Sequence, residues 1–361
     1  MDDVRDRRED PAVGGRPVSA ALEAFLSDLG EPAYRARQAA EAKRRGAADW
    51  DGVTSWPRAL RELVGESLPL WAVSPEGSAV SRDGTVKWAL RAGDGARIET
   101  VSIAHARSRR TVCVSSQVGC ALGCRFCATA RMGPGRDLTG EEILDQVVLA
   151  ATVAERDGAH VSNVVLMGMG EPLQNLGGVM EACGRICDPA GLGLSPRKVA
   201  ISTAGWVPGI AELTHHPLGV RLAISLHAAD DATRSELMPI NNRWPIANLL
   251  AACRRYCDTT GRRVFIEYLL LDGVNDSTAD ARRLATLVRD GRFNVNIIEY
   301  NPTEGPYRGS SSTRRESFIL ALEKAGVTPS VRRSRGADID AACGQLALRG
   351  VNQPAPEPAE D

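Results

Sequence analysis

Three cysteines could bind one metal cluster, because Cys120, Cys124 and Cys127 stand at positions i, i+4 and i+7. This spacing places three thiolates around a single loop. A [4Fe–4S] cluster has four iron corners and usually takes four cysteines, so three ligands from one loop leave the fourth iron open to a small molecule. Gly119 and Gly123 lie beside the ligands and permit the sharp turns that such a loop needs.

Two other interpretations of this loop remain open at this point. Zinc also binds cysteine, but structural zinc sites use four ligands, usually in C-x2-4-C pairs, and neither Cys113 nor a nearby histidine completes a pair. Free cysteines are also common as small core residues. We expect core packing for the four cysteines in helical stretches, since each pair falls on one helix face: Cys183, Cys187, Cys253 and Cys257.

Further candidate residues follow predicted strands directly. In an α/β barrel, functional groups gather at the carboxyl ends of the strands, so residues at these positions should converge. Each one alone could equally be a turn or a helix cap. Their joint placement favours a ligand site formed by Gly170, Glu171, Ser202, Ser225, Leu226, His227 and Asn301.

The elements that must position these residues alternate along the chain. Apolar spacing predicts short helices over 20–70, and strand-like alternation predicts a hairpin over 84–103 with its turn at 93–95. About six strand–helix units then follow, beginning with a strand at 112 and continuing with strands at 163–167, 198–202, 221–226, 264–270 and 295–300. This order predicts a parallel sheet with helices outside, and therefore an α/β fold with a partial (β/α)6 barrel.

Composition is that of a soluble globular protein. The chain has 361 residues, 43% hydrophobic and 25% charged, which is enough for one large domain and a smaller one. We predict a flexible leader at 1–18, a helical accessory domain at 19–80, the barrel with its hairpin extension at 84–350 and a disordered tail at 351–361. No apolar run approaches the ~20 residues of a membrane span, and the charged start excludes a secretory signal. A cytoplasmic protein is expected.

The chain resembles a known enzyme family at these motifs. The cysteine loop looks like that of the radical S-adenosylmethionine (SAM) enzymes. In finer detail, residues 113–129 and the later segment from Asp338 to Leu346, which contains Cys343, resemble the RlmN/Cfr adenine methyltransferases of ribosomal RNA. The second segment makes the match narrow. The resemblance implies a radical SAM barrel with a small N-terminal helical domain, one [4Fe–4S] cluster and two SAM molecules per turnover.

The resemblance also implies roles for individual residues. Cys343 would be methylated by one SAM and carry the methyl group to adenine, while Cys113 would form a transient disulfide with it and free the product. Glu99 matches the base that removes the ring proton. The strand-end residues named above would line the SAM pocket, and the three loop cysteines would bind the cluster. The second SAM, reduced at the cluster, would start radical chemistry at the methyl group.

The expected substrate is C2 of an adenosine in the peptidyl transferase centre of 23S rRNA, with tRNA as a further candidate. The formal net charge of -1 gives no global attraction to RNA, so local arginines must supply it. The candidates are Arg107, Arg109, Arg110, Arg125, Arg131, Arg136, Arg332, Arg333 and Arg335. The alternatives are a C8-methylating Cfr-like resistance enzyme, a relative with another substrate, or a non-catalytic iron–sulfur protein. A flavodoxin- or ferredoxin-like electron donor and a monomeric state are also expected.

Overall fold

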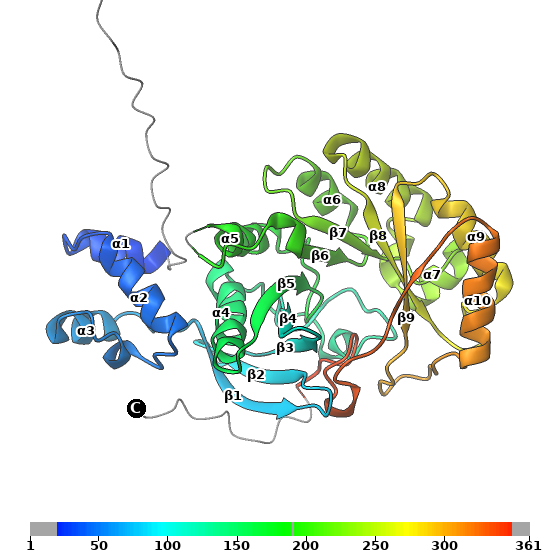
Figure 1. Cartoon of the computed structure of the whole chain (residues 1–361). Coiled ribbons are helices and arrows are strands. Elements are labelled where there is room, and N and C mark those ends of the chain that lie inside the picture. Colours follow the sequence, from blue (N-terminus) through cyan, green and yellow to red (C-terminus); the bar gives the residue numbers. More distant parts are fainter. Residues whose placement is uncertain (1–19, 190, 349–361) are drawn as a thin grey trace, which may run out of the picture.

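The computed structural model describes residues 20–189 and 191–348 (Figure 1). The leader expected at 1–18 and the tail expected at 351–361 lie outside the described residues. In the described part of the chain, no helix has the length and apolar character that a membrane crossing requires.

One curved sheet of ten strands forms the centre of the molecule, and its strands follow each other in chain order (Figure 1). The first four strands pair antiparallel, and every later strand pairs parallel with the one before it. The strands are β1 (Val73–Val80), β2 (Val86–Ala92), β3 (Arg97–His105), β4 (Arg109–Cys113), β5 (His160–Leu166), β6 (Val199–Thr203), β7 (Arg221–Ser225), β8 (Val264–Leu270), β9 (Phe293–Glu299) and β10 (Ser330–Arg332).

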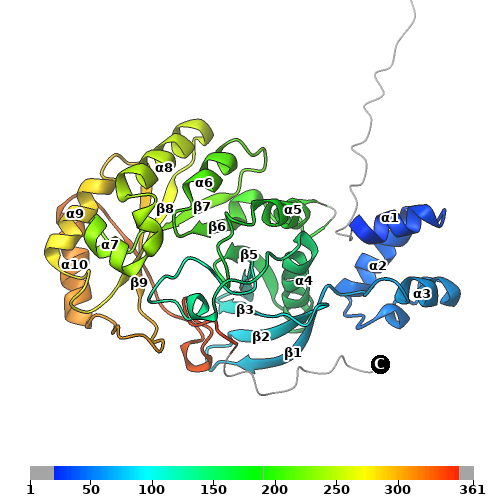
Figure 2. The ribbon, with the colours of Figure 1, turned by 180° about the vertical axis from the view of Figure 1, so that it is seen from behind.

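Helices connect the parallel strands and cover the outer, convex side of the sheet (Figures 1 and 2). Parallel strands require such crossovers, and here the crossovers pack the outer face of the sheet. The α/β fold with an open, partial barrel is confirmed. The helices are α1 (Ala20–Asp28), α2 (Tyr34–Arg44), α3 (Arg58–Gly65), α4 (Gly140–Arg156), α5 (Leu176–Cys187), α6 (Val207–Thr214), α7 (Asp231–Leu237), α8 (Ile246–Thr260), α9 (Thr278–Val288) and α10 (Ser312–Lys324).

The β2–β3 hairpin lies where the sequence predicted it, but one further strand precedes it. Residues 73–80, which the sequence assigned to the helical accessory domain, form β1 and pair with β2. A bulge between Pro75 and Gly77 interrupts the register. Pro75 has no amide hydrogen to donate, and such a residue is tolerated here because β1 is an edge strand. The sheet therefore begins before residue 80, and the helices of the accessory region end near residue 65.

The helices α1 to α3 surround a small core of their own beside α4 (Figure 1). Trp50 and Trp56 stack with ring centroids 5.2 Å apart. Ala39 and Ala40 of α2 are buried in this core. Their small side chains let α2 pack close to the two tryptophans, whereas larger side chains at these positions would hold the helix further away. The accessory helices thus pack through two tryptophans rather than through large residues on α2.

The C-terminal segment after β10 returns to the open side of the sheet, near the ends of β2 and β3 (Figure 1). Ser81 donates a hydrogen bond to Asp338 (2.6 Å), and Asn301 donates one to the carbonyl of Cys343 (3.3 Å). The segment is therefore tied both to the antiparallel extension and to the last long strand of the barrel.

Candidate active site

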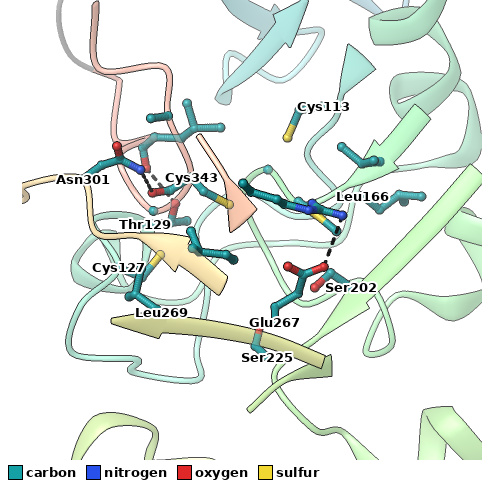
Figure 3. Close-up of a pocket in the computed structure, with 18 of the residues that line it drawn as sticks. Cys113, Cys127, Thr129, Leu166, Ser202, Ser225, Glu267, Leu269, Asn301 and Cys343 are labelled. Atoms are coloured by element: carbon teal, nitrogen blue, oxygen red, sulfur yellow. Dashed lines mark hydrogen bonds and ion pairs between the residues drawn. The ribbon is translucent and has the colours of Figure 1, made fainter. Parts of the chain in front are cut away.

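A cavity of about 750 Å³ opens at the carboxyl ends of the parallel strands (Figure 3). This volume is in the range of small-molecule and cofactor sites. All three cluster-loop cysteines line it, as do both cysteines of the proposed methyl-transfer pair. Of the ligand-site residues expected from the sequence, the cavity wall includes Gly170, Glu171, Ser202, Ser225, His227 and Asn301.

The cluster loop follows β4 and is shaped by glycines. Gly119 and Gly123 both have positive φ, at 78° and 69°. A Cβ on Gly119 would lie 2.3 Å from the carbonyl oxygen of Gly133, which also accepts a hydrogen bond from the Cys120 amide (2.9 Å). Only glycine fits this close approach, so the loop curls tightly around its cysteines.

The chemistry of the three thiols fits an iron–sulfur cluster. Burial raises the pKa of Cys120 to about 11, and burial followed by its two cysteine neighbours raises that of Cys124 well above its ordinary value. Three thiolates so close together in an enclosed loop are therefore unfavourable unless a cationic group compensates them. Among residues 20–189 and 191–348, no three His, Cys, Asp or Glu side chains converge on the position of a single metal ion. A [4Fe–4S] cluster does not need such convergence, because each cysteine binds a different iron corner.

Cys113 and Cys343 line the same cavity although they come from opposite ends of the barrel (Figure 3). Cys113 ends β4 and is buried, while the side chain of Cys343 is open to the cavity. Burial, and then the nearby Cys343 thiol, raise the pKa of Cys113 well above its usual range. All nine cysteines lie among the described residues and are free, so the disulfide that the resemblance implies is absent from this state of the protein.

The segment that carries Cys343 is bound by the cluster loop itself. The Ala128 amide donates a hydrogen bond to the Gly344 carbonyl (2.8 Å), and the Thr129 hydroxyl donates one to the Leu346 carbonyl (2.7 Å). Gln345 donates from its side chain to the carbonyl of Pro302 (3.0 Å). A movement of the cysteine loop would therefore also move the segment that carries Cys343.

Glu171 is a buried carboxylate at the end of β5. Its two oxygens accept hydrogen bonds from the amides of Leu173 (3.1 Å) and Ala204 (2.8 Å). Burial nevertheless raises its pKa to about 7. The preceding Gly170 has φ +99°, and a Cβ there would lie 2.5 Å from the side chain of Gln117. This arrangement places one carboxylate and a glycine backbone in the cavity wall.

The remaining strand-end residues divide into two groups. Ser202, Ser225, His227 and Asn301 line the cavity, and His227 accepts a hydrogen bond from the Leu269 amide through Nδ1 (3.1 Å). Leu226 instead points its side chain into the hydrophobic core, where it is fully buried.

Glu99 lies beside the cavity but does not form part of its wall. It is fully buried on β3 and pairs with Lys87 of β2, with 3.0 Å between Oε1 and Nζ. Its Oε2 accepts a hydrogen bond from the amide of Leu348 (3.0 Å). The C-terminal segment therefore covers Glu99, the residue that the family resemblance assigns as the base.

One charged residue of the cavity wall, Glu267, was not predicted from the sequence. Glu267 on β8 is buried in the wall and pairs with Arg332 of β10 (3.3 Å). The sequence carried no signal for Glu267, because it stands inside an apolar strand without a motif.

Of the arginines expected near RNA, four line the cavity: Arg109, Arg332, Arg333 and Arg335. Arg136 instead forms ion pairs with Asp94 and Glu142.

Comparison with known proteins places this site in a family. Residues 114–285 match the model of the Radical SAM superfamily. The chain is 45% identical, over 93% of its own length and 92% of the relative's, to the dual-specificity RNA methyltransferase RlmN of Anaeromyxobacter sp. (strain Fw109-5). A probable enzyme of the same name from Thermobifida fusca (strain YX) is 45% identical, over 90% of this chain and 92% of that protein.

A solved structure agrees with this placement. The radical SAM methyltransferase from Sphaerobacter thermophilus is 47% identical, with a TM-score of 0.86 over 91% of this chain and 96% of that one. The similarity spans the cluster loop, the barrel and the Cys343 segment together. This chain belongs to the radical SAM superfamily and, within it, to the RlmN family of RNA methyltransferases.

Proposed function

We propose that the protein methylates C2 of an adenosine in the peptidyl transferase centre of 23S rRNA, and an adenosine in tRNA as a second substrate. The relatives named above are dual-specificity RNA methyltransferases, which supports two RNA substrates. They carry the RlmN name throughout, which favours C2 over the C8 chemistry of Cfr-like enzymes.

One observation carries the proposal. Cys113 and Cys343 line the same cavity as the three-cysteine loop. A cluster protein without catalysis has no need for two further thiols there. The tight binding of the Cys343 segment to the cluster loop supports the same conclusion.

The cofactors have candidate positions in this cavity. Cys120, Cys124 and Cys127 would hold one [4Fe–4S] cluster. Glu171 would bind the ammonium group of SAM, and the other strand-end residues of the cavity wall would orient the rest of the molecule. When bound, the cluster and SAM supply an electron, a methyl group and radical hydrogen abstraction, and the protein supplies orientation.

The residues of the chain itself would carry the methyl group. The Cys343 thiol is accessible from the cavity, but its enclosed position withdraws it from bulk water. This desolvation raises its pKa to about 11, and the charge of Glu267 adds to the effect. Its thiol is therefore protonated at neutral pH and must lose a proton when it accepts a methyl group. Cys113 would later attack the sulfur of Cys343 as a thiolate and form the disulfide. The bond between this sulfur and the transferred carbon would break, and the carbon would take the electron pair and a proton to become the methyl group of the product. Glu99 is proposed to accept the ring proton, which requires the segment at Leu348 to move away from its carboxylate.

The RNA would approach over the arginines at the mouth of the cavity, since arginine side chains bind phosphates. Arg109, Arg333 and Arg335 are exposed there. We further propose a flavodoxin- or ferredoxin-like electron donor, a monomer as the working state and the cytoplasm as its location.

The test is nucleoside mass spectrometry on 23S rRNA fragments and tRNA after anaerobic incubation with reconstituted enzyme, SAM and a reductant. The proposal predicts 2-methyladenosine in both RNAs, and none with the Cys343→Ala variant. An 8-methyladenosine product would contradict the C2 assignment. Cleavage of SAM without any methylated base would contradict the RNA assignment.

A further inference from the structure

Glu267 is a buried carboxylate whose two oxygens have different surroundings. It stands on β8, is 2% exposed and lines the cavity. Oε1 accepts a hydrogen bond from Asn296 Nδ2 (2.8 Å) and pairs with Arg332 Nη2 (3.3 Å). Asn296 is held in turn by the hydroxyl of Ser330. One carboxylate oxygen is therefore fixed by donors from β9 and β10.

The other oxygen, Oε2, is buried without a hydrogen-bond partner among the described residues. Leaving such an acceptor unpaired is unfavourable, and more so for a charged group. A protein retains an arrangement of this kind when a ligand completes it. The carboxyl group points into the cavity, with Ser202 and Ser225 on one side and Cys343 on the other (Figure 3).

The charge balance shows what kind of ligand group fits. Arg332 already offsets the negative charge of Glu267, so a second cation has little to gain at Oε2. A carboxylate accepts hydrogen bonds and donates none. The missing partner is therefore a neutral N–H or O–H donor. Glu267 and Cys343 both line this cavity (Figure 3), so a donor that reaches Oε2 lies on the side of the cavity that also carries the Cys343 thiol.

Two adenosine groups come to this point in the proposed function, the one in SAM and the one in the target RNA. Both offer neutral donors, as ribose hydroxyls or as the exocyclic amine of adenine. We propose that Glu267 is a binding residue for an adenosine group and that its Oε2 accepts a hydrogen bond from such a donor. This inference rests on the proposed function, because that function brings adenosine to the cavity.

The experiment compares Glu267→Gln and Glu267→Ala with the wild-type enzyme in two measurements. Calorimetry on the cluster-loaded enzyme gives the affinity for SAM. Single-turnover methylation is then measured on two RNA fragments, one with adenosine and one with purine riboside, which lacks the exocyclic amine. Glu299→Gln is the matched control, because Glu299 lies on the neighbouring strand, pairs with Arg315 and is absent from the cavity wall. Iron content and melting temperature show whether each variant is folded.

A donor on SAM predicts a loss of SAM affinity of about 10- to 100-fold in both Glu267 variants, and no change in the control. A donor on the target predicts unchanged SAM affinity and a loss of similar size in the methylation rate on adenosine. If the donor is the exocyclic amine, the loss disappears on purine riboside, because the two changes remove the same hydrogen bond and are not additive. If the donor is a ribose hydroxyl of the target, the loss is equal on both RNAs.

Either result supports the inference and assigns the donor. If folded Glu267 variants keep SAM affinity and keep the methylation rates on both RNAs within about twofold of wild type, the inference is overturned. A wild-type enzyme that leaves adenosine unmethylated would contradict the proposed function instead. The SAM measurement then decides the inference alone.

Discussion

His227 is a buried imidazole that joins the barrel to the cluster loop. It follows β7 with φ +58°, and its Nδ1 accepts a hydrogen bond from the Leu269 amide. Its ring meets Phe126 of the cluster loop edge-on, with centroids 4.9 Å apart. Burial first, and the charge of Arg234 second, lower the pKa of His227 to about 3. The folded protein therefore keeps this ring neutral.

This pKa predicts acid sensitivity. In the unfolded chain the histidine takes up a proton near pH 6.5, while in the folded chain it resists protonation until about pH 3. Its contribution to stability is thus complete above pH 6.5 and is lost as the pH falls toward 3. The full loss is on the order of 5 kcal/mol.

The variant His227→Asn should reduce this acid sensitivity, because asparagine tolerates positive φ and its side-chain oxygen can accept from Leu269, but it does not titrate. Urea unfolding midpoints at pH 7.5 and pH 5 should differ less in this variant than in wild type. His160→Asn, on an exposed position of β5, serves as control. Equal pH dependence in wild type and His227→Asn would contradict this account.

At the residue scale, the sequence predicted those groups whose chemistry is visible in local spacing. The three loop cysteines are of this kind. Local spacing indicates neither Glu99, which only the family resemblance assigns as a base, nor Glu267, which was not predicted at all. A carboxylate on a strand takes its role from neighbours distant in sequence. Lys87 and Leu348 enclose Glu99, whereas Asn296 and Arg332 leave one oxygen of Glu267 open to the cavity.

At the scale of elements, the cluster loop depends on its glycines. The backbone at Gly119 combines a positive φ with a close approach to Gly133 that leaves no room for a Cβ. At Gly123 the φ is also positive, but a Cβ would be 3.7 Å from its nearest neighbour, Pro239. Strain alone costs roughly 1 kcal/mol at such a position, whereas the contact at Gly119 forces the backbone to shift.

We therefore expect Gly119→Ala to load much less iron than wild type after anaerobic reconstitution, and Gly123→Ala to load an intermediate or normal amount. Gly93→Ala is the control, since it lies in the β2–β3 turn, where an added Cβ meets nothing within 4 Å. Iron and sulfide per chain are the measured quantities. Normal loading of Gly119→Ala would show that the loop does not need this close contact.

Element prediction from the sequence succeeded where the local signals of helix and strand were strong. The capping box of Thr139 and Glu142 marks the start of α4 in the sequence, and both of its hydrogen bonds are present. Strand β1 was missed because Pro75 and Gly77 weaken a strand pattern, and only the neighbouring β2 makes the bulged edge strand stable. The cavity itself could not be predicted in detail, because it depends on how far the C-terminal segment reaches across the sheet.

At the scale of the whole molecule, a buried ion pair joins the accessory helices to the barrel. Lys43 of α2 pairs with Asp145 of α4, and both side chains are nearly inaccessible to solvent. Asp145 also accepts a hydrogen bond from the Ala72 amide (2.7 Å), between the helices and β1. Burial raises the pKa of Asp145 to about 6, while Lys43 opposes this shift.

Removing the lysine by Lys43→Met should loosen the accessory helices, because Asp145 would remain buried without its cation. Breaking a buried pair in this way typically costs about 3–5 kcal/mol. Hydrogen exchange should therefore accelerate in α1 to α3 and at the start of β1, while iron loading stays normal. Arg58→Met removes an exposed pair with Glu62 and should change nothing measurable. Unchanged exchange in Lys43→Met would contradict the role of this pair.

The most direct test of the whole account concerns the two cysteines of the cavity. If Cys113 releases the product from Cys343, its loss must leave the methylated RNA attached to the protein. Cys113→Ala, incubated anaerobically with SAM, reductant and an rRNA fragment, should give a covalent adduct that resists denaturation and migrates slowly on a denaturing gel. The double variant Cys113→Ala/Cys343→Ala should give none. Free 2-methyladenosine released by Cys113→Ala at the wild-type rate, without an adduct, would contradict the two-cysteine mechanism.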